Sequence, residues 1–135
     1  MSYQIEEIEG IGPANASKLA MADITNTEHL LTKCGDAAGR KSVGETTGFD
    51  PSTLLKWANM ADLMRIKGVA EEYSELLEAS GVDTVKELRN RNADNLAAKM
   101  DEVNNDKSLT RKVPSAKVVG EWIEQAKTLD PRITH

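Results

Sequence analysis

The chain has 135 residues, of which 39% are hydrophobic and only 4% aromatic, and its formal net charge is −5. This length allows one compact domain or two small units that share a core. No apolar run approaches the roughly 20 residues of a membrane-spanning helix, and an acidic chain does not attract nucleic acid by its overall charge.

The termini and the cysteine content indicate a compartment. Residues 1–10, MSYQIEEIEG, are acidic and lack an apolar signal core, so we expect mature sequence. Cys34 is the single cysteine and cannot form an internal disulfide. This usage favours a cytoplasmic protein that does not associate with membranes.

The first predicted elements meet within residues 8–19, IEGIGPANASKL. A helix that ends near Glu9, a turn at 10–12 and a helix that begins at Pro13 would form a helix-hairpin-helix unit. Glycine adopts positive φ without a Cβ penalty and allows close approach of another backbone. We expect Ile11, between the two glycines, to be buried in the core.

Residues 34–48, CGDAAGRKSVGETTG, predict only a weak helix, because each of Gly39, Gly44 and Gly48 lowers helix propensity. Arg40 and Lys41 are expected to make a small basic spot on the surface of this segment.

A stronger helix is predicted from Pro51, with Asp50 as its N-cap. Its apolar residues recur at intervals of three and four: Leu54, Trp57, Ala58, Ala61 and Met64. We expect Trp57 to lie in the core, and we expect the helix to continue unbroken to residue 67 and to join the two halves of the chain.

Residues 66–82, IKGVAEEYSELLEASGV, repeat the pattern of residues 8–24 at an offset of 58. The matched positions are Ile8 and Ile66, Gly10 and Gly68, Ile11 and Val69, Leu19 and Leu77, and Ile24 and Val82. Glycine and apolar positions recur, whereas polar positions do not. This indicates the same backbone shape with two different surfaces. Gly81 is expected in the left-handed position that ends a helix.

The last part of the chain predicts two more helices. One follows the spacing of Leu96, Met100 and Val103, and the other contains Trp122 at a place that matches Trp57. The segment between them, residues 108–117, is a basic loop, SLTRKVPSAK, without an acidic residue.

The predicted fold is therefore all-α, with two tandem helix-hairpin-helix units related by a pseudo-twofold repeat. The first unit is expected at 1–63 and the second at 64–135, each with trailing helices. The two are expected to pack as one compact domain.

A glycine hairpin of this kind offers an anion site. The first amides of the second helix have no partner within the helix and lie at the positive end of its dipole. A nucleic-acid phosphate held there is contacted without regard to sequence. Gly10, Gly12 and Ala14 are the candidate amides, Lys18 lies one turn further along, and Arg111 and Lys112 would add charge.

Two alternatives remain open. The first hairpin is equally compatible with a turn that only packs two helices. In the second hairpin Ala70 replaces the second glycine, and acidic residues at the helix start would themselves occupy the anion site. Its acidic face would then suit a protein partner, so a protein-interaction adaptor is the competing function. The residues of that face are Glu71, Glu72, Glu75 and Glu78.

No motif predicts catalysis. His29, Cys34 and His135 do not form a metal-ligand spacing, and there is no glycine-rich phosphate loop ending in Lys-Ser or Lys-Thr. We expect no metal, no cofactor and no enzyme activity.

Residues 5–24 resemble the helix-hairpin-helix motif, with Ala16 and Leu19 at its small and apolar helix positions. The whole chain resembles a family of small bacterial tandem helix-hairpin-helix proteins catalogued as a domain of unknown function. This resemblance implies two hairpin units and transfers no activity. Better-studied proteins with paired hairpins, such as DNA ligases and repair polymerases, imply DNA-backbone contact, in some cases with a monovalent cation at the hairpin carbonyls.

Overall fold

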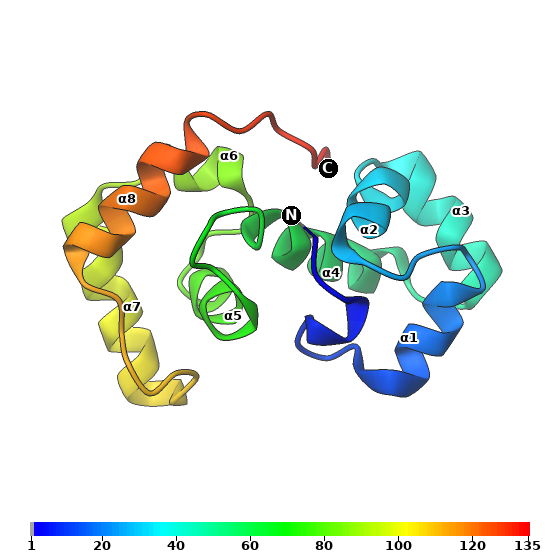
Figure 1. Ribbon diagram of the computed structural model, residues 1–135, viewed down its shortest axis with the longest axis horizontal. Coiled ribbons are helices and arrows are strands. Elements are labelled where there is room, and N and C mark those ends of the chain that lie inside the picture. The colour runs from blue at the N-terminus through cyan, green and yellow to red at the C-terminus, as the bar shows by residue number, and fades with distance from the viewer. Residues whose placement is uncertain (1) are drawn as a thin grey trace.

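A computed structural model describes residues 2–135 of the chain as an assembly of helices (Figure 1). The elements are the 3₁₀ helix η1 (Ile5–Glu7) and the α-helices α1 (Gly12–Ala20), α2 (Thr27–Cys34), α3 (Ala37–Thr47), α4 (Pro51–Leu63), α5 (Glu71–Ala79), α6 (Val85–Leu88), α7 (Ala93–Lys107) and α8 (Ala116–Ala126). Within residues 2–135 the extended backbone pairs only at an isolated bridge between Gln4 and Asn26. The predicted all-α class is confirmed.

Most α-helices begin at a polar side chain that accepts a hydrogen bond from an amide of the first turn. Asp50 accepts from the Ser52 amide and Ser115 from the Val118 amide, as predicted. The residues between 34 and 48 form α3 over eleven residues, with Asp36 as its cap and Gly48 in the left-handed conformation at its end.

The prediction of one unbroken helix from 51 to 67 is wrong, because α4 ends at Leu63. Beyond this point the amides of Arg65 and Ile66 bond three residues back, to Asp62 and Leu63. Gly68 then takes a φ of +96°, a conformation that no helix tolerates. This tight turn lets Ile66 and Val69 both enter the core, where each is fully buried.

The buried residues form two clusters, and α4 contributes to both. The first cluster collects residues of η1, α1, α2, α3 and α4. The second collects Leu63, at the end of α4, with residues of α5 to α8. Figure 1 shows α4 between these two lobes, with α1 to α3 on one side and α5 to α8 on the other. The boundary between the lobes is called the seam below.

Several turn features recur at the offset of 58 residues. Gly10 and Gly68 have φ values of +92° and +96°, and Asp23 and Gly81 have φ values of +61° and +94°. Asn26 and Thr84 cap α2 and α6 by the same bond, from the amide three residues on. The left-handed conformation expected at Gly81 is confirmed, and both Trp57 and Trp122 are buried, as predicted.

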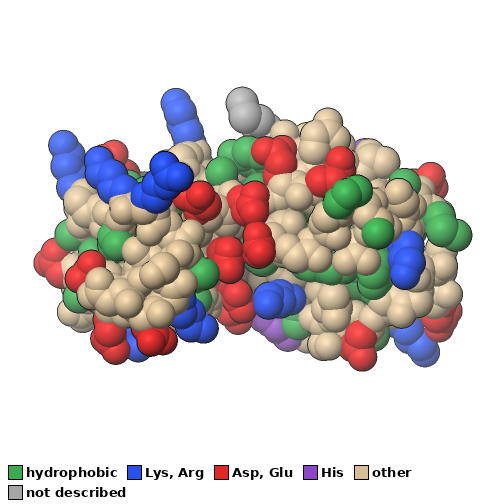
Figure 2. Space-filling view, turned by 90° about the horizontal axis from the view of Figure 1, so that it is seen from below, with side chains coloured by type: hydrophobic (Ala, Val, Ile, Leu, Met, Phe, Trp, Pro, Cys, Tyr) green, Lys and Arg blue, Asp and Glu red, His purple; other side chains and the backbone are tan. Residues whose placement is uncertain are grey.

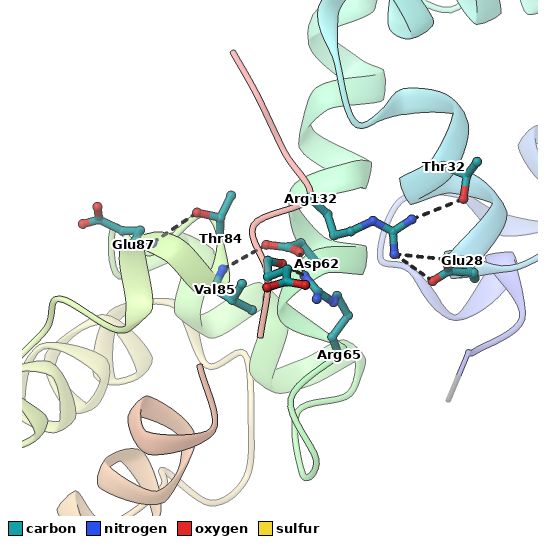
Figure 3. Close-up of polar contacts among 9 residues, drawn as sticks. Glu28, Thr32, Asp62, Arg65, Thr84, Val85, Glu87 and Arg132 are labelled. Carbon is teal, nitrogen blue, oxygen red and sulfur yellow. Dashed lines mark hydrogen bonds and ion pairs between the residues drawn. The ribbon is translucent and has the colours of Figure 1, made fainter. Parts of the chain in front are cut away.

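One polar junction lies where α4 meets α6 (Figure 3). Asp62 is fully buried, and its carboxylate accepts hydrogen bonds from Arg65 Nη1 at 2.7 Å and from the Val85 amide at 2.9 Å. The Val85 amide has no acceptor within its own helix, because it lies in the first turn of α6. The Asp62 carboxylate supplies that acceptor from α4.

Residues 130–135, called the strap below, cross from α8 back to the first lobe (Figure 1). Ile133 joins the first cluster, and the Thr134 amide donates to the Gly35 carbonyl at 2.8 Å. Arg40 is 4% exposed and donates to the carbonyls of Cys34 and Thr134. The expected surface spot of Arg40 and Lys41 is therefore wrong, because the Arg40 guanidinium has a structural role beneath the strap.

Candidate nucleic-acid interface

The first hairpin is a tight turn that the two glycines make possible. Gly10 and Gly12 both have left-handed φ values, +92° and +63°. Between them Ile11 is 2% exposed, as predicted, and its amide donates to the Ile8 carbonyl. The Asn15 amide side chain donates to the Gly10 carbonyl at 3.3 Å, which ties the turn to the first turn of α1.

The amides at the start of α1 are available to a ligand. No side chain caps this helix, and its first turn contains Pro13 and no acidic residue. In the part of the chain that the structure describes, the amides of Gly10, Gly12 and Ala14 donate to no backbone or side-chain acceptor. Because Ala14 is exposed and Gly12 partly so, an anion approaching from solvent would meet unpaired donors.

Lys18 of α1 is linked to the first hairpin through aromatic side chains. Its Nζ lies 5.7 Å from the centre of the Phe49 ring, within the range of a cation–π contact. The Phe49 ring packs edge-on against Trp57 at 4.9 Å between centroids, and Trp57 Nε1 lies against Gly10. The structure therefore connects the predicted Lys18 to the first hairpin through two aromatic rings.

The second hairpin follows a different path. Ala70, which takes the place of Gly12, has an extended backbone with φ −111° and ψ −157°, because its Cβ disfavours the left-handed conformation. As a result α5 begins only at Glu71, with two acidic residues in its first turn. The side chain of Gln125 also bonds to both the amide and the carbonyl of Lys67, at 2.9 and 3.3 Å. This clamp fixes the second hairpin to α8.

The basic loop lies beside the second hairpin. The Tyr73 hydroxyl donates to the Lys112 carbonyl at 2.9 Å, and the Thr110 hydroxyl donates to Glu72 at 3.3 Å. Arg111 and Lys112 are both exposed. The structure therefore anchors these two predicted residues to α5, the helix that carries the acidic face, and not to α1.

The acidic side chains of the two lobes meet at the seam. Figure 2 shows Asp and Glu side chains gathered between the lobes, while Lys and Arg side chains project from the lobe that contains α7 and α8. A hydrogen bond with Glu9 raises the pKa of Glu71, and burial and the nearby carboxylates add to this effect. The pKa of Glu75 is also raised, chiefly by burial and then by Glu9, against the opposing effect of Lys56.

A cleft of about 730 Å³ opens at the same place. Its walls come from the first hairpin, the exposed edge of α4, the acidic face of α5 and the start of the basic loop, and among its lining residues are Glu9, Gly10, Trp57, Glu75 and Lys107. The first hairpin and the beginning of the basic loop thus face a common cleft, although Arg111 and Lys112 lie further along the loop.

Sequence reasoning missed two features of this site. The contact between Glu9 and Glu71 joins residues 62 positions apart, and no local pattern reports such a distance. The Phe49 ring beside Lys18 was also missed. The signal that pointed to the region was the pair of apolar-glycine turns, each preceded by a charged residue.

Residues 2–135 present neither a metal-binding cluster nor a membrane-spanning helix. These residues contain no group of three or more His, Cys, Asp or Glu side chains arranged to hold a metal ion. Among their helices, none combines the length and the apolar character needed to cross a membrane.

Comparison with protein families identifies the family of the chain. A family model described as "Domain of unknown function (DUF4332)" matches residues 9–129. The matched range contains both hairpins, the seam and the basic loop, and the description assigns no activity to them. No curated protein and no solved structure matches the chain.

Proposed function

The chain belongs to the DUF4332 family. We propose that it is a non-catalytic module of two tandem helix-hairpin-helix units. In this proposal the first hairpin contacts the backbone of a nucleic acid, DNA above all, without reading its sequence. Each unit has a left-handed hairpin glycine against the indole nitrogen of its own tryptophan, Gly10 with Trp57 and Gly68 with Trp122.

The observation that carries the nucleic-acid proposal is the uncapped start of α1. Gly12 and Ala14 supply amides without acceptors in the described residues, at the end of the helix where the dipole favours an anion. Lys18, in the last turn of α1, is the proposed cation for a phosphate held there. Donors of this kind contact phosphate oxygens and not base edges, so the binding would not depend on sequence.

The acidic seam limits how strong this contact is. Glu9 directly precedes Gly10 and is exposed, and the whole chain carries a charge of −5. We therefore expect weak binding that is detected at low ionic strength. With about two phosphates neutralised, a fourfold rise in salt concentration should weaken the affinity by about tenfold.

The test is a titration of labelled duplex DNA and of a branched DNA junction, followed by fluorescence anisotropy at increasing salt. Ala14→Glu should abolish binding, since it gives the first hairpin the acidic first turn that Glu72 gives the second. The substitution should leave the fold intact, because an acidic residue near a helix N-terminus adds roughly 0.3–1 kcal/mol of stability. Gly12→Glu should also abolish binding, but it adds backbone strain.

Ala98→Glu is the matched control. It adds the same charge at an exposed position of α7, and we expect it to bind DNA nearly as well as the unmodified chain. Equal losses in Ala14→Glu and Ala98→Glu would show that net charge, and not the hairpin, governs binding. Absence of binding to both DNA forms at low salt would exclude the proposal.

A second candidate function is a protein-interaction adaptor that uses the acidic face of α5. Glu71, Glu72, Glu75 and Glu78 form no ion pair within the described residues. A hydrogen bond with Glu9, and then burial and the charges of neighbouring carboxylates, raise the pKa of Glu71. Carboxylates held together without an ion-pair partner favour a basic partner. Such a partner would neutralise repulsion that the isolated chain retains.

The adaptor predicts a stoichiometric partner that is lost when the charge of the face is reversed. A pull-down with the Glu71→Lys, Glu72→Lys double variant should lose that partner. The control is Glu121→Lys together with Glu124→Lys, the same reversal on exposed residues of α8. A partner that is retained by the first variant, or lost equally in both, would contradict the adaptor.

A further inference from the structure

The strap, residues 130–135, is held by the first lobe in the way that a binding protein holds a peptide. It contains no helix or strand, and the chain of polar contacts begins where Arg65 Nη1 donates to the Asp130 carbonyl at 2.9 Å. Beyond that residue, the strap makes polar contacts with α2, Gly35 and Arg40.

Three successive residues of the strap make three different kinds of contact. Arg132 donates to the Glu28 carboxylate and to the Thr32 hydroxyl, both on α2 (Figure 3). Ile133 is 7% exposed and packs into the first core cluster. Thr134 uses only its backbone, with its amide donating to Gly35 and its carbonyl accepting from Arg40 at 2.7 Å.

The surface that receives the strap contacts its backbone through Gly35 and Arg40. A Cβ on Gly35 would lie 2.6 Å from the Arg132 carbonyl and 2.6 Å from the Leu31 carbonyl of α2, so glycine serves both the end of α2 and the approach of the strap. The Arg40 guanidinium, nine-tenths buried, holds one donor toward the Cys34 carbonyl and the other toward the strap. Beside the strap a depression of about 410 Å³ remains open, lined in part by Leu31, Thr32 and Asp36.

We propose that this groove on the first lobe is a recognition site for an extended Arg-Ile-Thr segment. Its occupant in trans is the strap of a second copy of the chain, which binds when the groove's own strap is displaced. The recognition combines an ion pair, one apolar anchor and a backbone clamp, as in other modes of extended-peptide binding. The chain's own strap blocks the groove because a tethered ligand has an effective concentration near the millimolar range.

The test uses the full chain with its own strap disabled by Arg132→Ala and Ile133→Ala. The probe is a synthetic peptide of residues 129–135, LDPRITH, titrated by calorimetry or by amide chemical shifts. We expect saturable one-to-one binding to this variant, with shifts at Gly35 and Arg40, and at least tenfold weaker binding to the unmodified chain, whose strap competes. A peptide with the same two alanine changes is the control and should not bind.

Two further measurements apply if the double variant is destabilised: its thermal midpoint with added peptide, and the effect of a Glu28 substitution on peptide affinity. The peptide should raise the thermal midpoint of the variant in a concentration-dependent way, since it binds the folded state only. Adding Glu28→Gln removes the exposed ion pair and should lower the affinity for the peptide by a factor of about 2–5. Equal binding of both peptides, or no binding and no rise in the midpoint, would overturn the proposal.

Discussion

Gly10 and Trp57 are in contact across the first lobe, so that a Cβ added to Gly10 would lie 3.6 Å from the indole Nε1. Gly68 and Trp122 repeat the relationship in the second lobe at 3.3 Å. Each hairpin is therefore held from both sides, by its own positive φ and by a buried tryptophan. The positive φ explains why glycine occurs at both positions although the residues around them differ, and at Gly68 the closer approach of Trp122 adds a second reason.

Replacing either glycine should destabilise the protein. Gly10→Ala and Gly68→Ala each impose a left-handed conformation on a residue with a Cβ, at a cost of about 1–2 kcal/mol. Gly68→Ala should cost more, because its new methyl group would press against Trp122. Gly120→Ala is the control, since Gly120 lies inside α8 without positive φ and its Cβ would make an ordinary contact. It should gain about 0.5–1 kcal/mol. Urea unfolding measures all three, and equal effects would contradict this account.

Asp62→Ala should be among the most damaging polar substitutions. It removes the acceptor for both Arg65 and the Val85 amide at a position that is fully buried. Loss of one partner of a buried pair costs about 3–5 kcal/mol, and we expect the lower end because the Arg65 side chain is 17% exposed. The control is Glu102→Ala, whose pair with Lys99 is exposed and contributes less than about 1 kcal/mol. Similar changes in the two urea midpoints would refute the role of Asp62.

The seam makes stability depend on pH. The pKa values of Glu71 and Glu75 are raised in the folded protein, so the folded state retains protons that the unfolded state releases. Their contribution is complete below the ordinary glutamate pKa and is lost as pH rises through the higher folded values. Unfolding midpoints measured from pH 4 upward should therefore fall more steeply for the unmodified chain than for Glu71→Gln.

Glu121→Gln, on the exposed face of α8, is the matched control for this pH dependence and should follow the unmodified chain. A carboxyl titration by NMR should also give Glu71 a pKa above the ordinary glutamate value. If Glu71→Gln and Glu121→Gln have the same pH profile, the carboxyl pair at the seam does not influence stability.

Cys34 should be unreactive in the native protein. It is fully buried, and this burial raises its pKa to about 11 despite the nearby Arg40. Because the thiolate is the reactive form, a disulfide reagent at pH 8 should label Cys34 only through opening of the first lobe. Arg132→Ala, which loosens the strap beside it, should speed the labelling several-fold. Labelling at the rate of a free thiol in the native chain would contradict this arrangement.

The local features were predictable because they depend on neighbouring residues. Helices start at Asp50 and Ser115 since their side chains reach amides within the next turn. The hairpin glycines and the buried Ile11 followed from the apolar-glycine spacing and its recurrence. The break after Leu63 did not follow, because the helical periodicity continues to Met64 and only the need to bury Ile66 and Val69 in the second cluster turns the chain.

By itself the sequence determined the all-α class, the glycine turns and the family to which the chain belongs. The tertiary structure alone decided which side chains meet across the chain. It placed the acidic pair Glu9 and Glu71 at the seam, attached the basic loop to α5 and buried Arg40 under the strap. These contacts join residues between 39 and 94 positions apart, and their energies depend on burial and dielectric environment, which a local pattern of residue types does not contain.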